Sequence, residues 1–351
     1  MLRRNPLHAT YINARREEEK ADQGYFFLAN KAALEEDCVA VKLALLERRK
    51  LLIISLVVAA SLSSLLKRFV DIPRPCQIKP SLYPTCLPDY AFPSGHVSDA
   101  FSFVFPFLGH WLLPCTYFLG LLIGWSRASI GLHSLLDVGG GIAVAGFSYN
   151  FAQALIVKNK KMSNKDDESA RQAFHAVSNL LACLMVWLVG IESTSYLVLA
   201  WTCSCIIMLH TAMIGIRLPG SDELERTIGR RGEILGEGSL YNALGLLFIP
   251  GILRGNSAAA IAAILIFGLG DSISTYVGSI YGRHKLPWND KKSAEGSLGF
   301  LAGGMISLLF LPQPAAVLAI IIAAAIESLP IKLNDNLTVP MALSLTFYFL
   351  L

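Results

Sequence analysis

The chain has 351 residues, of which 54% are hydrophobic and only 16% are charged, and its mean hydropathy is +0.51. This composition excludes an ordinary soluble domain, and the net charge of +4 gives no support for a nucleic-acid partner. Apolar stretches of membrane-spanning length recur along the chain. We therefore predict an all-α fold, a polytopic helical membrane protein with about 10–11 membrane helices in two bundles.

The predicted spans begin after a mixed-charge segment, residues 1–50, which ends with Arg48-Arg49-Lys50. No cleavable signal peptide is evident, because the first apolar run starts only near residue 51. The predicted spans are 51–66, 96–113, 114–130, 137–157, 174–191, 193–213, 240–254, 257–281, 296–311, 313–328 and 338–351.

A lysine-rich polar stretch divides these spans into two groups. We predict a first membrane domain at 51–158, a linker at 159–173 and a second membrane domain at 174–351. Basic residues favour the cytoplasmic side of a membrane, so segment 1–50 and the linker are predicted to be cytoplasmic.

The first domain carries three clusters of ionisable or turn-forming residues beside its spans. They are Lys67 with Arg74-Pro75, then Pro93-Ser94-Gly95-His96, then Ser126-Arg127 with His133 and Asp137. Ionisable groups beside membrane spans are costly, so a functional role is the first interpretation. Taken singly, each cluster has a structural alternative, such as a helix start or a polar contact between helices.

Together the clusters suit the transfer of a phosphoryl group. His133 and Asp137 are four residues apart and would share one face of a helix. The carboxylate would fix one tautomer of the imidazole and leave its other nitrogen free to act as a nucleophile. His96 follows a turn at a predicted helix start and could protonate the leaving group.

The remaining residues of these clusters are suited to hold the phosphate. Ser94 and the backbone N–H of Gly95 could bind phosphate oxygens at the start of a helix. Lys67, Arg74 and Arg127 would stabilise the negative charge, and this chemistry needs no metal.

This pattern over residues 67–137 resembles the three motifs of the type 2 phosphatidic acid phosphatase superfamily of lipid phosphatases. The resemblance implies that His133 becomes a phosphohistidine, that Asp137 is its partner and that His96 is the general acid. One departure is clear, because only one predicted span precedes the first motif, where that superfamily usually has more.

Seven cysteines are scattered along the chain without metal-ligand spacing. Cys76 and Cys86 both lie in the loop between the first two clusters. If this loop faces an oxidising compartment, Cys76 and Cys86 could form a disulfide.

The second domain carries a different cluster of acidic, glycine and lysine residues. Its members are Asp271, Gly278, Gly282, Lys291-Lys292-Ser293 and Glu295-Gly296. Glycines four residues apart allow close approach, either of a ligand or of a neighbouring helix. Paired lysines beside a helix start suit a polyphosphate, although they also suit a cytoplasmic loop. Asp271 and Asp335 are candidate Mg²⁺ ligands.

The run from Asp271 to Gly296 resembles the CTP-binding motif of the CTP-dependent dolichol and phytol kinase family, which a diacylglycerol kinase group shares. Ser274 and Ser293 depart conservatively from it. The resemblance implies that CTP is the phosphate donor and a long-chain lipid alcohol the acceptor, with Mg²⁺ as cofactor. Further local resemblances include Glu327 and the stretch 335–340.

The sequence therefore predicts a fusion of two lipid-phosphate enzymes in one multi-pass membrane protein. The first would dephosphorylate a polyprenyl or dolichyl (di)phosphate on the extracytoplasmic side, and the second would phosphorylate the alcohol on the cytoplasmic side. The membrane could be a prokaryotic plasma membrane or the endoplasmic reticulum. One alternative is a phosphatidate phosphatase joined to a CTP-dependent diacylglycerol kinase. Another is a lipid-binding scaffold or flippase with inactive domains.

Overall fold

The computed structural model describes residues 46–79, 86, 88–156, 168–216, 218, 234 and 236–351. The chain divides into two compact units, Met1–Lys50 and Leu51–Leu351. Most of the predicted segment 1–50, and most of the predicted linker, lie outside the described residues.

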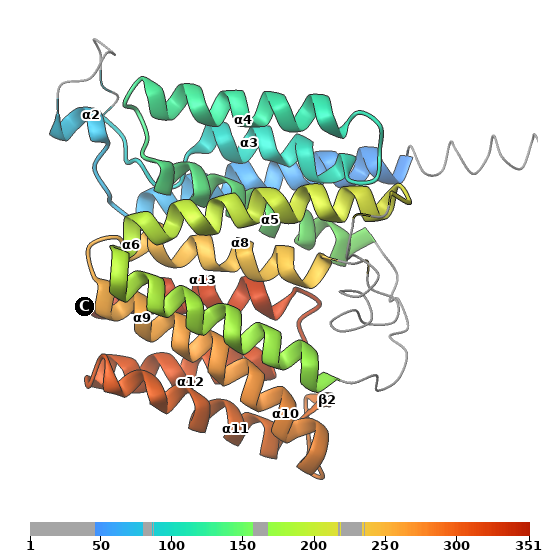
Figure 1. Cartoon of the computed structure of the whole chain (residues 1–351), viewed down its shortest axis with the longest axis vertical. Coiled ribbons are helices and arrows are strands. Elements are labelled where there is room, and N and C mark those ends of the chain that lie inside the picture. Colours follow the sequence, from blue (N-terminus) through green and yellow to red (C-terminus); the bar gives the residue numbers. More distant parts are fainter. Residues whose placement is uncertain are drawn as a thin grey trace, which may run out of the picture. The chain divides into compact units, whose positions relative to one another are not determined.

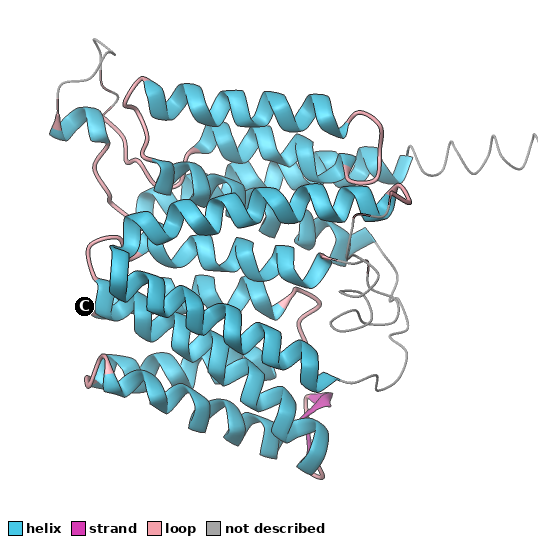
Figure 2. Cartoon of the chain, viewed as in Figure 1, coloured by secondary structure: helices cyan, strands magenta, loops and turns pink. Residues whose placement is uncertain are grey.

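The described part of the second unit is almost entirely helical, as predicted for an all-α membrane protein (Figures 1 and 2). A helix at Leu46–Phe69 comes first. It is followed by α2 (Pro75–Ile78), α3 (Gly95–Val104), η1 (Phe105–Phe107), α4 (Leu113–Ser129), α5 (Leu135–Ile156), α6 (Glu168–Met213), α8 (Glu237–Ile252), α9 (Ser257–Leu265), η2 (Ile266–Gly270), α10 (Asp271–Tyr281), β1 (Lys285–Leu286), β2 (Asn289–Ser293), α11 (Ala294–Gly304), η3 (Met305–Leu309), α12 (Pro314–Ser328) and α13 (Asp335–Leu350).

The predicted spans fall on helices with boundaries that differ by a few residues, except that 96–113 covers α3 and η1 and then the turn at 108–112. The spans 174–191 and 193–213 are joined in α6, which is interrupted at Gly190, where φ is 85°. Among the described residues, three helices are long and apolar enough to cross a membrane: Leu46–Phe69, Arg171–Met213 and Ser257–Tyr281. Ala294–Leu309 and Pro314–Ser328 are shorter apolar helices.

The two predicted domains share hydrophobic cores. One core joins Phe92 and Ala143 of the first domain to Phe248, Phe267 and other residues of the second. Helix α8 packs against α5 from the first domain and against α6 and α13 from the second. The domain boundaries stay a prediction, but helices from both sides of the linker pack as one unit.

The short antiparallel hairpin of β1 and β2 was not predicted from the sequence. It connects α10 to α11 and stands out in magenta in Figure 2. In Figure 1, β2 lies at one end of the helices and α2 lies at the other.

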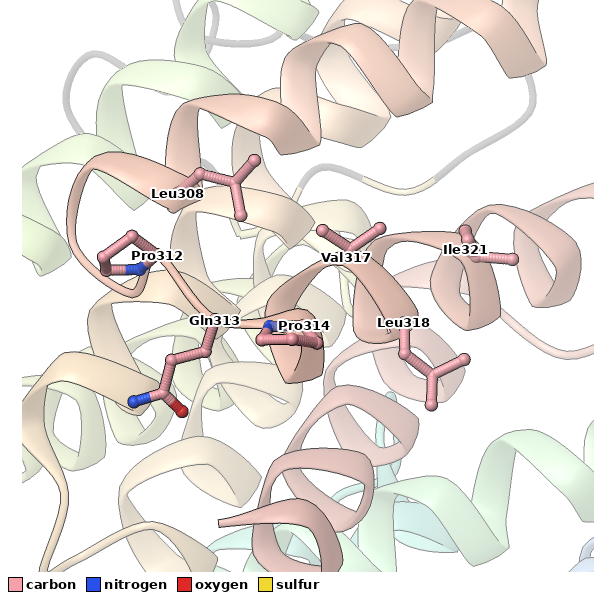
Figure 3. Close-up of a pocket in the computed structure, with 7 residues that line it drawn as sticks. All are labelled: Leu308, Pro312, Gln313, Pro314, Val317, Leu318 and Ile321. Carbon is pink, nitrogen blue, oxygen red and sulfur yellow. The ribbon is translucent and has the colours of Figure 1, made fainter.

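A separate apolar pocket lies beside α12 (Figure 3). It is lined by Leu308, Pro312, Gln313, Pro314, Val317, Leu318 and Ile321. None of these residues belongs to the clusters predicted to bind phosphate or nucleotide. Exposed apolar side chains are expected on the lipid-facing surface of a membrane protein, so we assign this pocket no role in catalysis.

Candidate active sites

His133 lies in the short connection between α4 and α5, which also brings Arg127 towards the first site. The backbone N–H of His133 donates to the carbonyl of Arg127 at 3.2 Å. Nη1 of Arg74 lies 3.2 Å from Nε2 of His133 and donates to the carbonyl of Leu132 at 3.3 Å. The predicted nucleophilic nitrogen therefore faces a guanidinium group that could bind a phosphate oxygen.

Asp137, in the first turn of α5, is fully buried. Its Oδ2 accepts hydrogen bonds from the backbone N–H of Ser134 at 2.6 Å and from the Ser134 hydroxyl at 2.9 Å. The same oxygen lies 3.8 Å from Nδ1 of His133, which is longer than a hydrogen bond. The structure therefore brings the predicted pair together, with Ser134 holding the carboxylate.

The Pro93-Ser94-Gly95-His96 turn is joined to this pair through the backbone. Ser94 caps α3, and its N–H donates to the carbonyl of Asp137 at 2.9 Å. The hydroxyl of Ser94 is buried and has no hydrogen-bond partner among the described residues. A Cβ placed on Gly95 would meet no atom within 4 Å, so there is open space over this turn. His96 is exposed at the first turn of α3 and lies within range of the charges of Arg127 and His133.

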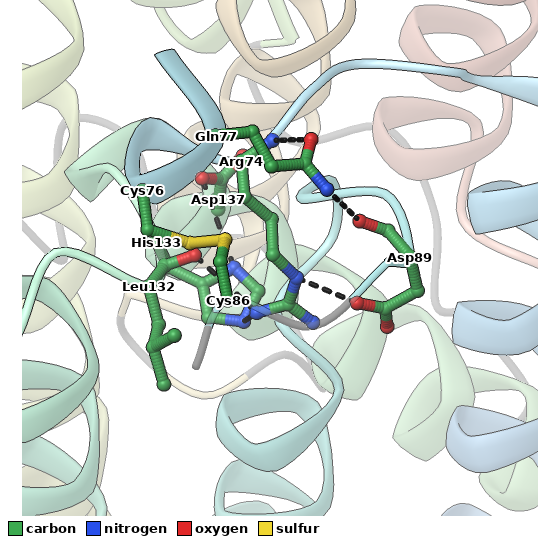
Figure 4. The surroundings of a disulfide bond; sticks show 8 residues. All are labelled: Arg74, Cys76, Gln77, Cys86, Asp89, Leu132, His133 and Asp137. Atoms are coloured by element: carbon green, nitrogen blue, oxygen red, sulfur yellow. Dashed lines mark hydrogen bonds and ion pairs between the residues drawn. A yellow bond between two sulfur atoms is a disulfide. The ribbon is translucent and has the colours of Figure 1, made fainter. Parts of the chain in front are cut away.

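Asp89, which sequence reasoning missed, pairs with two of the predicted cations, Lys67 and Arg74, and Figure 4 shows its contact with Arg74. Oδ1 of Asp89 accepts from Nε of Arg74 at 2.6 Å, and Oδ2 lies 3.3 Å from Nζ of Lys67. Lys67 also donates to the carbonyl of Tyr90 at 2.9 Å. Partial burial raises the pKa of Asp89, but the Arg74 hydrogen bond and the charge of Lys67 outweigh it and hold this pKa below its ordinary value.

Arg127 completes the set of predicted phosphate-binding cations. Its Nε is buried and has no hydrogen-bond partner within the described part of the chain. Buried polar groups are normally paired, so an unpaired guanidinium N–H of Arg127 and an unpaired Ser94 hydroxyl each suit an anionic ligand.

The Cys76–Cys86 disulfide is present, with 5.9 Å between the two Cα atoms. Cys76 lies in α2, two residues after Arg74, and Figure 4 shows the bond next to the Arg74 side chain. The disulfide closes a short loop that begins two residues after Arg74 and ends three residues before Asp89.

Burial also affects the imidazole of His133. Its side chain is 2% exposed, and this burial lowers its pKa below the ordinary histidine value. The nearby carboxylate of Asp137 opposes the shift, while the charges of Arg74 and Lys67 reinforce it. This shift favours the neutral imidazole, which is the form that can attack phosphorus.

The second predicted cluster is brought together by α10, the β hairpin and α11. Ser293 caps α11 by accepting a hydrogen bond from the N–H of Gly296 at 3.1 Å. A Cβ on Gly278 would lie 3.5 Å from the Cα of Gly296, and one on Gly282 would lie 2.7 Å from the Ser293 hydroxyl. These glycines therefore allow α10 to approach the start of α11 closely.

Lys292 pairs with two carboxylates from other helices. Its Nζ forms an ion pair with Glu327 at the end of α12 and lies 3.2 Å from Oδ2 of Asp335 at the start of α13. Burial alone would lower the pKa of Lys292, but the two carboxylates outweigh it and raise this pKa. Partial burial and the charges of Asp271 and Glu327 raise the pKa of Asp335 to about 6, although Lys292 opposes them.

This concentration of negative charge fits a cation bound with a polyphosphate. Asp271 and Glu327 are close enough to Asp335 for their charges to raise its pKa. Oε2 of the buried Glu327 has no hydrogen-bond partner among the described residues. Two carboxylates with phosphate oxygens are a typical Mg²⁺ environment, although the described residues contain no cluster of three or more protein groups placed to hold a metal.

The other members of the second cluster lie around this centre. Oδ2 of Asp271 is 3.8 Å from Nδ1 of His175 in α6. Lys291 is exposed on β2. Glu295 accepts from the backbone N–H of His284, and its Oε1 lies 2.6 Å from Nδ1 of that residue. The structure thus assigns Glu295 a role in holding the hairpin against α11.

Sequence reasoning also missed Arg254, which lies in the turn between α8 and α9. Its Nη2 donates to Oδ1 of Asp137 at 2.7 Å. Arg254 is a lone arginine in an otherwise apolar stretch, which is the one signal that could have marked it.

Comparisons with known proteins match two kinds of lipid-phosphate enzyme. A PAP2 superfamily model matches residues 50–161, which contain all of the predicted residues of the first site. The chain is 27% identical over 245 residues to phytol kinase 1, chloroplastic, of Arabidopsis thaliana, covering 63% of this chain and 79% of the relative. It is 29% identical over 201 residues to a probable phytol kinase, chloroplastic, of Zea mays, covering 52% and 66%. It is 31% identical over 154 residues to probable phytol kinase 2, chloroplastic, of Oryza sativa subsp. japonica, covering 38% and 50%. No solved structure matches the chain.

Proposed function

We propose that this protein is a bifunctional membrane enzyme of lipid-phosphate metabolism. One site removes phosphate from a lipid phosphate, and the other transfers the γ-phosphate of CTP to a long-chain isoprenoid alcohol. The observation that carries the proposal is the convergence of Arg74 and Asp137 on opposite nitrogens of His133. The PAP2 match supports the first activity and the phytol kinase relatives support the second.

In the first reaction, Nε2 of His133 attacks phosphorus and the bond between phosphorus and the leaving oxygen breaks. His96 donates a proton to that oxygen, and Lys67, Arg74 and Arg127 stabilise the charge on the phosphoryl oxygens. Water then attacks the phosphohistidine and gives a proton to His96, the bond between phosphorus and Nε2 breaks, and phosphate leaves with the imidazole of His133 restored. The neutral state that burial gives His133 suits this role.

In the second reaction, Lys291 and Lys292 bind the phosphates of CTP, and the start of α11 offers backbone N–H groups to them. Asp271 and Asp335 would hold Mg²⁺, which neutralises charge on the phosphate oxygens. The hydroxyl oxygen of the lipid attacks the γ-phosphorus and its proton passes to a carboxylate of the site, Asp271 or Asp335; the bond to the β-phosphate oxygen breaks, and CDP leaves.

The two sites would face opposite sides of one membrane. The helices Leu46–Phe69 and Ser257–Tyr281 are long enough to cross it. The elements α2 and β2, one from each site, lie at opposite ends of the helices in Figure 1. This separation would keep the phosphatase from reversing the kinase reaction, and both activities would supply a polyprenyl phosphate carrier for glycan assembly.

The test is transfer of label from γ-labelled CTP to lipid by the purified protein. We expect label in polyprenol or phytol, and its loss in the Asp271→Ala variant. His133→Ala is included in every sample so that the phosphatase does not remove the product. Label in diacylglycerol alone would reassign the substrate to glycerolipids. No labelled lipid of any kind would overturn the kinase assignment.

The phosphatase is tested separately by release of phosphate from farnesyl diphosphate and from phosphatidate. Wild type should release phosphate and His133→Ala should not, and rapid quenching should trap a phosphorylated His133. Absence of hydrolysis of either lipid would favour a scaffold or flippase with an inactive domain.

A further inference from the structure

The side chain of Arg254 comes from the second predicted domain but is bound within the first site. It belongs to the turn between α8 and α9, where its Nε and Nη2 donate to the carbonyl of Gly251 at 3.1 and 3.0 Å. These bonds direct the guanidinium towards α5. Nη2 then donates to Oδ1 of Asp137 at 2.7 Å, and Nη1 lies 3.4 Å from the Ser134 hydroxyl.

Arg254 is the closest cation to the buried carboxylate of Asp137 among the ion pairs of the described residues. Asp137 has no exposed surface, and a buried carboxylate requires a paired charge or several hydrogen bonds. Nδ1 of His133 lies 3.8 Å from this carboxylate, whereas Nη2 of Arg254 lies 2.7 Å from it. Arg254 therefore supplies the compensating charge that the first domain lacks at this position.

The same guanidinium also packs on the turn that carries Ser94. Its Cζ lies 5.8 Å from the centre of the Phe92 ring, which is fully buried beside that turn. Arg254 therefore contacts Asp137, whose backbone carbonyl accepts from the Ser94 N–H, and Phe92, which lies two residues before Ser94. It makes no hydrogen bond to His133 or Arg74, so it acts through Asp137.

We propose that Arg254 is a positioning residue of the phosphatase: it neutralises Asp137 and fixes the carboxylate that orients His133, so the second domain completes the active site of the first. The proposal rests on the phosphatase activity proposed above. It predicts that the first domain depends on the second for catalysis as well as for folding.

The test compares wild type with Arg254→Gln in the full-length protein, using phosphate release from farnesyl diphosphate. We expect kcat to fall on the order of tenfold to hundredfold, because displacing an orienting group misplaces the nucleophile. KM should change less than about threefold, since Arg254 does not contact the phosphate-binding cations. Arg254→Lys should recover part of kcat, because it restores the charge but not the forked geometry. Arg283→Gln, at an exposed arginine of the same domain, is the matched control and should leave phosphate release unchanged.

A double-mutant cycle separates positioning from general damage to the fold. In an Asp137→Asn background, adding Arg254→Gln should cause little further loss, because the charge that Arg254 compensates is already absent. An undiminished further loss in that background would overturn the proposal, as would unchanged kcat in Arg254→Gln alone.

A second measurement, which does not depend on catalysis, tests the positioning role of Arg254 separately from the phosphatase activity. Diethyl pyrocarbonate modifies neutral imidazole, so the pH dependence of His133 modification, followed by mass spectrometry, reports its protonation. Lys67, Arg74 and Asp137 are the charged groups that act on His133. Without Arg254 the uncompensated Asp137 carboxylate should move the modification midpoint of His133 to higher pH. If the wild type hydrolyses no lipid phosphate but the midpoint of His133 modification moves in Arg254→Gln, the proposed activity is wrong and the positioning role stands. If the midpoint does not move, the positioning role is wrong.

Discussion

At the scale of single residues, the first site is organised so that a histidine stays neutral among cations. His133 is buried, its Nε2 faces Arg74 and its Nδ1 faces Asp137. Asp89 holds Arg74 and Lys67 from the open side of the cluster. Asp89 is 48% exposed, so its carboxylate can be displaced into water. A phosphate that enters the site would then replace this carboxylate as the partner of Arg74 and Lys67.

The lowered pKa of His133 predicts the pH dependence of phosphate release. Because the folded protein keeps this imidazole neutral below the ordinary histidine value of 6.5, activity should persist as the pH falls through that value. The measurement is kcat/KM against pH for phosphatidate and farnesyl diphosphate, so that ionisation of each substrate can be recognised. Asp137→Asn should move the acid limb lower still, since the carboxylate favours the imidazolium. An acid limb above pH 6.5 would contradict the assignment.

The ion pairs of Lys292 predict a stability effect in the second site. Lys292→Met leaves the carboxylates of Glu327 and Asp335 without their cation, and Glu327 is only 1% exposed. Breaking a buried pair in this way should lower the free energy of unfolding by on the order of 3 kcal/mol. Thermal unfolding in detergent would measure it. Lys291→Met, at the exposed neighbour, should change stability by less than about 0.5 kcal/mol, and equal effects would show that the pairing is not stabilising.

The residues that sequence reasoning found and missed differ in how far apart they lie in the chain. His133 and Asp137 lie four residues apart, and Ser94 lies in a Pro-Ser-Gly-His turn, so each of these short patterns could be interpreted directly. Arg254 is 117 residues from Asp137, and no sequence pattern pairs the two. Asp89 was missed for a different reason, since a lone aspartate in a polar loop usually faces solvent.

At the scale of elements, hydrophobic length identified the helices well, because a membrane span must satisfy its backbone hydrogen bonds internally. The break at Gly190 follows from its left-handed φ of 85°, which divides α6 where two spans were predicted. The β hairpin has too few residues to show a periodic pattern, and it is held by Ser328, whose backbone carbonyl accepts from Asn289 at 3.0 Å. Such a contact depends on packing and could not be predicted locally.

The contact between α8 and α13 predicts a glycine requirement. A Cβ on Gly245 would overlap the backbone carbonyl oxygen of Asn336 and touch the ring of Pro340 at 3.0 Å. Gly245→Ala should therefore lower the free energy of unfolding by about 1–3 kcal/mol, as expected for overpacking. Gly255→Ala is the control, because a Cβ there meets nothing within 4 Å. Chemical unfolding would measure the free energy of unfolding of both variants, and equal values would contradict the close packing of α8 against α13.

At the scale of the whole molecule, hydrogen bonds connect the two predicted domains at several levels. Asn150 in α5 accepts from the N–H of Asn334 at 3.0 Å, and Gln153 accepts from the Tyr241 hydroxyl at 3.0 Å. Near the first site, Tyr348 of α13 hydrogen-bonds to Asp71. Together with the shared cores, these contacts make the two domains one cohesive unit.

This cohesion predicts the result of cutting the predicted linker. A protease site inserted at 159–173 and cleaved in the purified protein should leave fragments that elute together in mild detergent. They should also keep at least about half of both activities, since the apolar area shared by α5 and α8 is unaffected. Uncleaved protein is the control. Separation of the fragments without unfolding would show that the domains are independent.

The environment of Phe92 has a consequence for the ancestry of the chain. The same edge of this ring packs against Gly140 of α5 and Gly251 of α8, and a Cβ on either glycine would overlap it. If the two predicted domains were independent modules, each could be replaced by that of a relative without harm. Because the Phe92 ring packs against one glycine from each predicted domain, either domain can be replaced only by one that has the matching glycine. The two halves of this protein are therefore expected to be inherited together and to fail when exchanged separately.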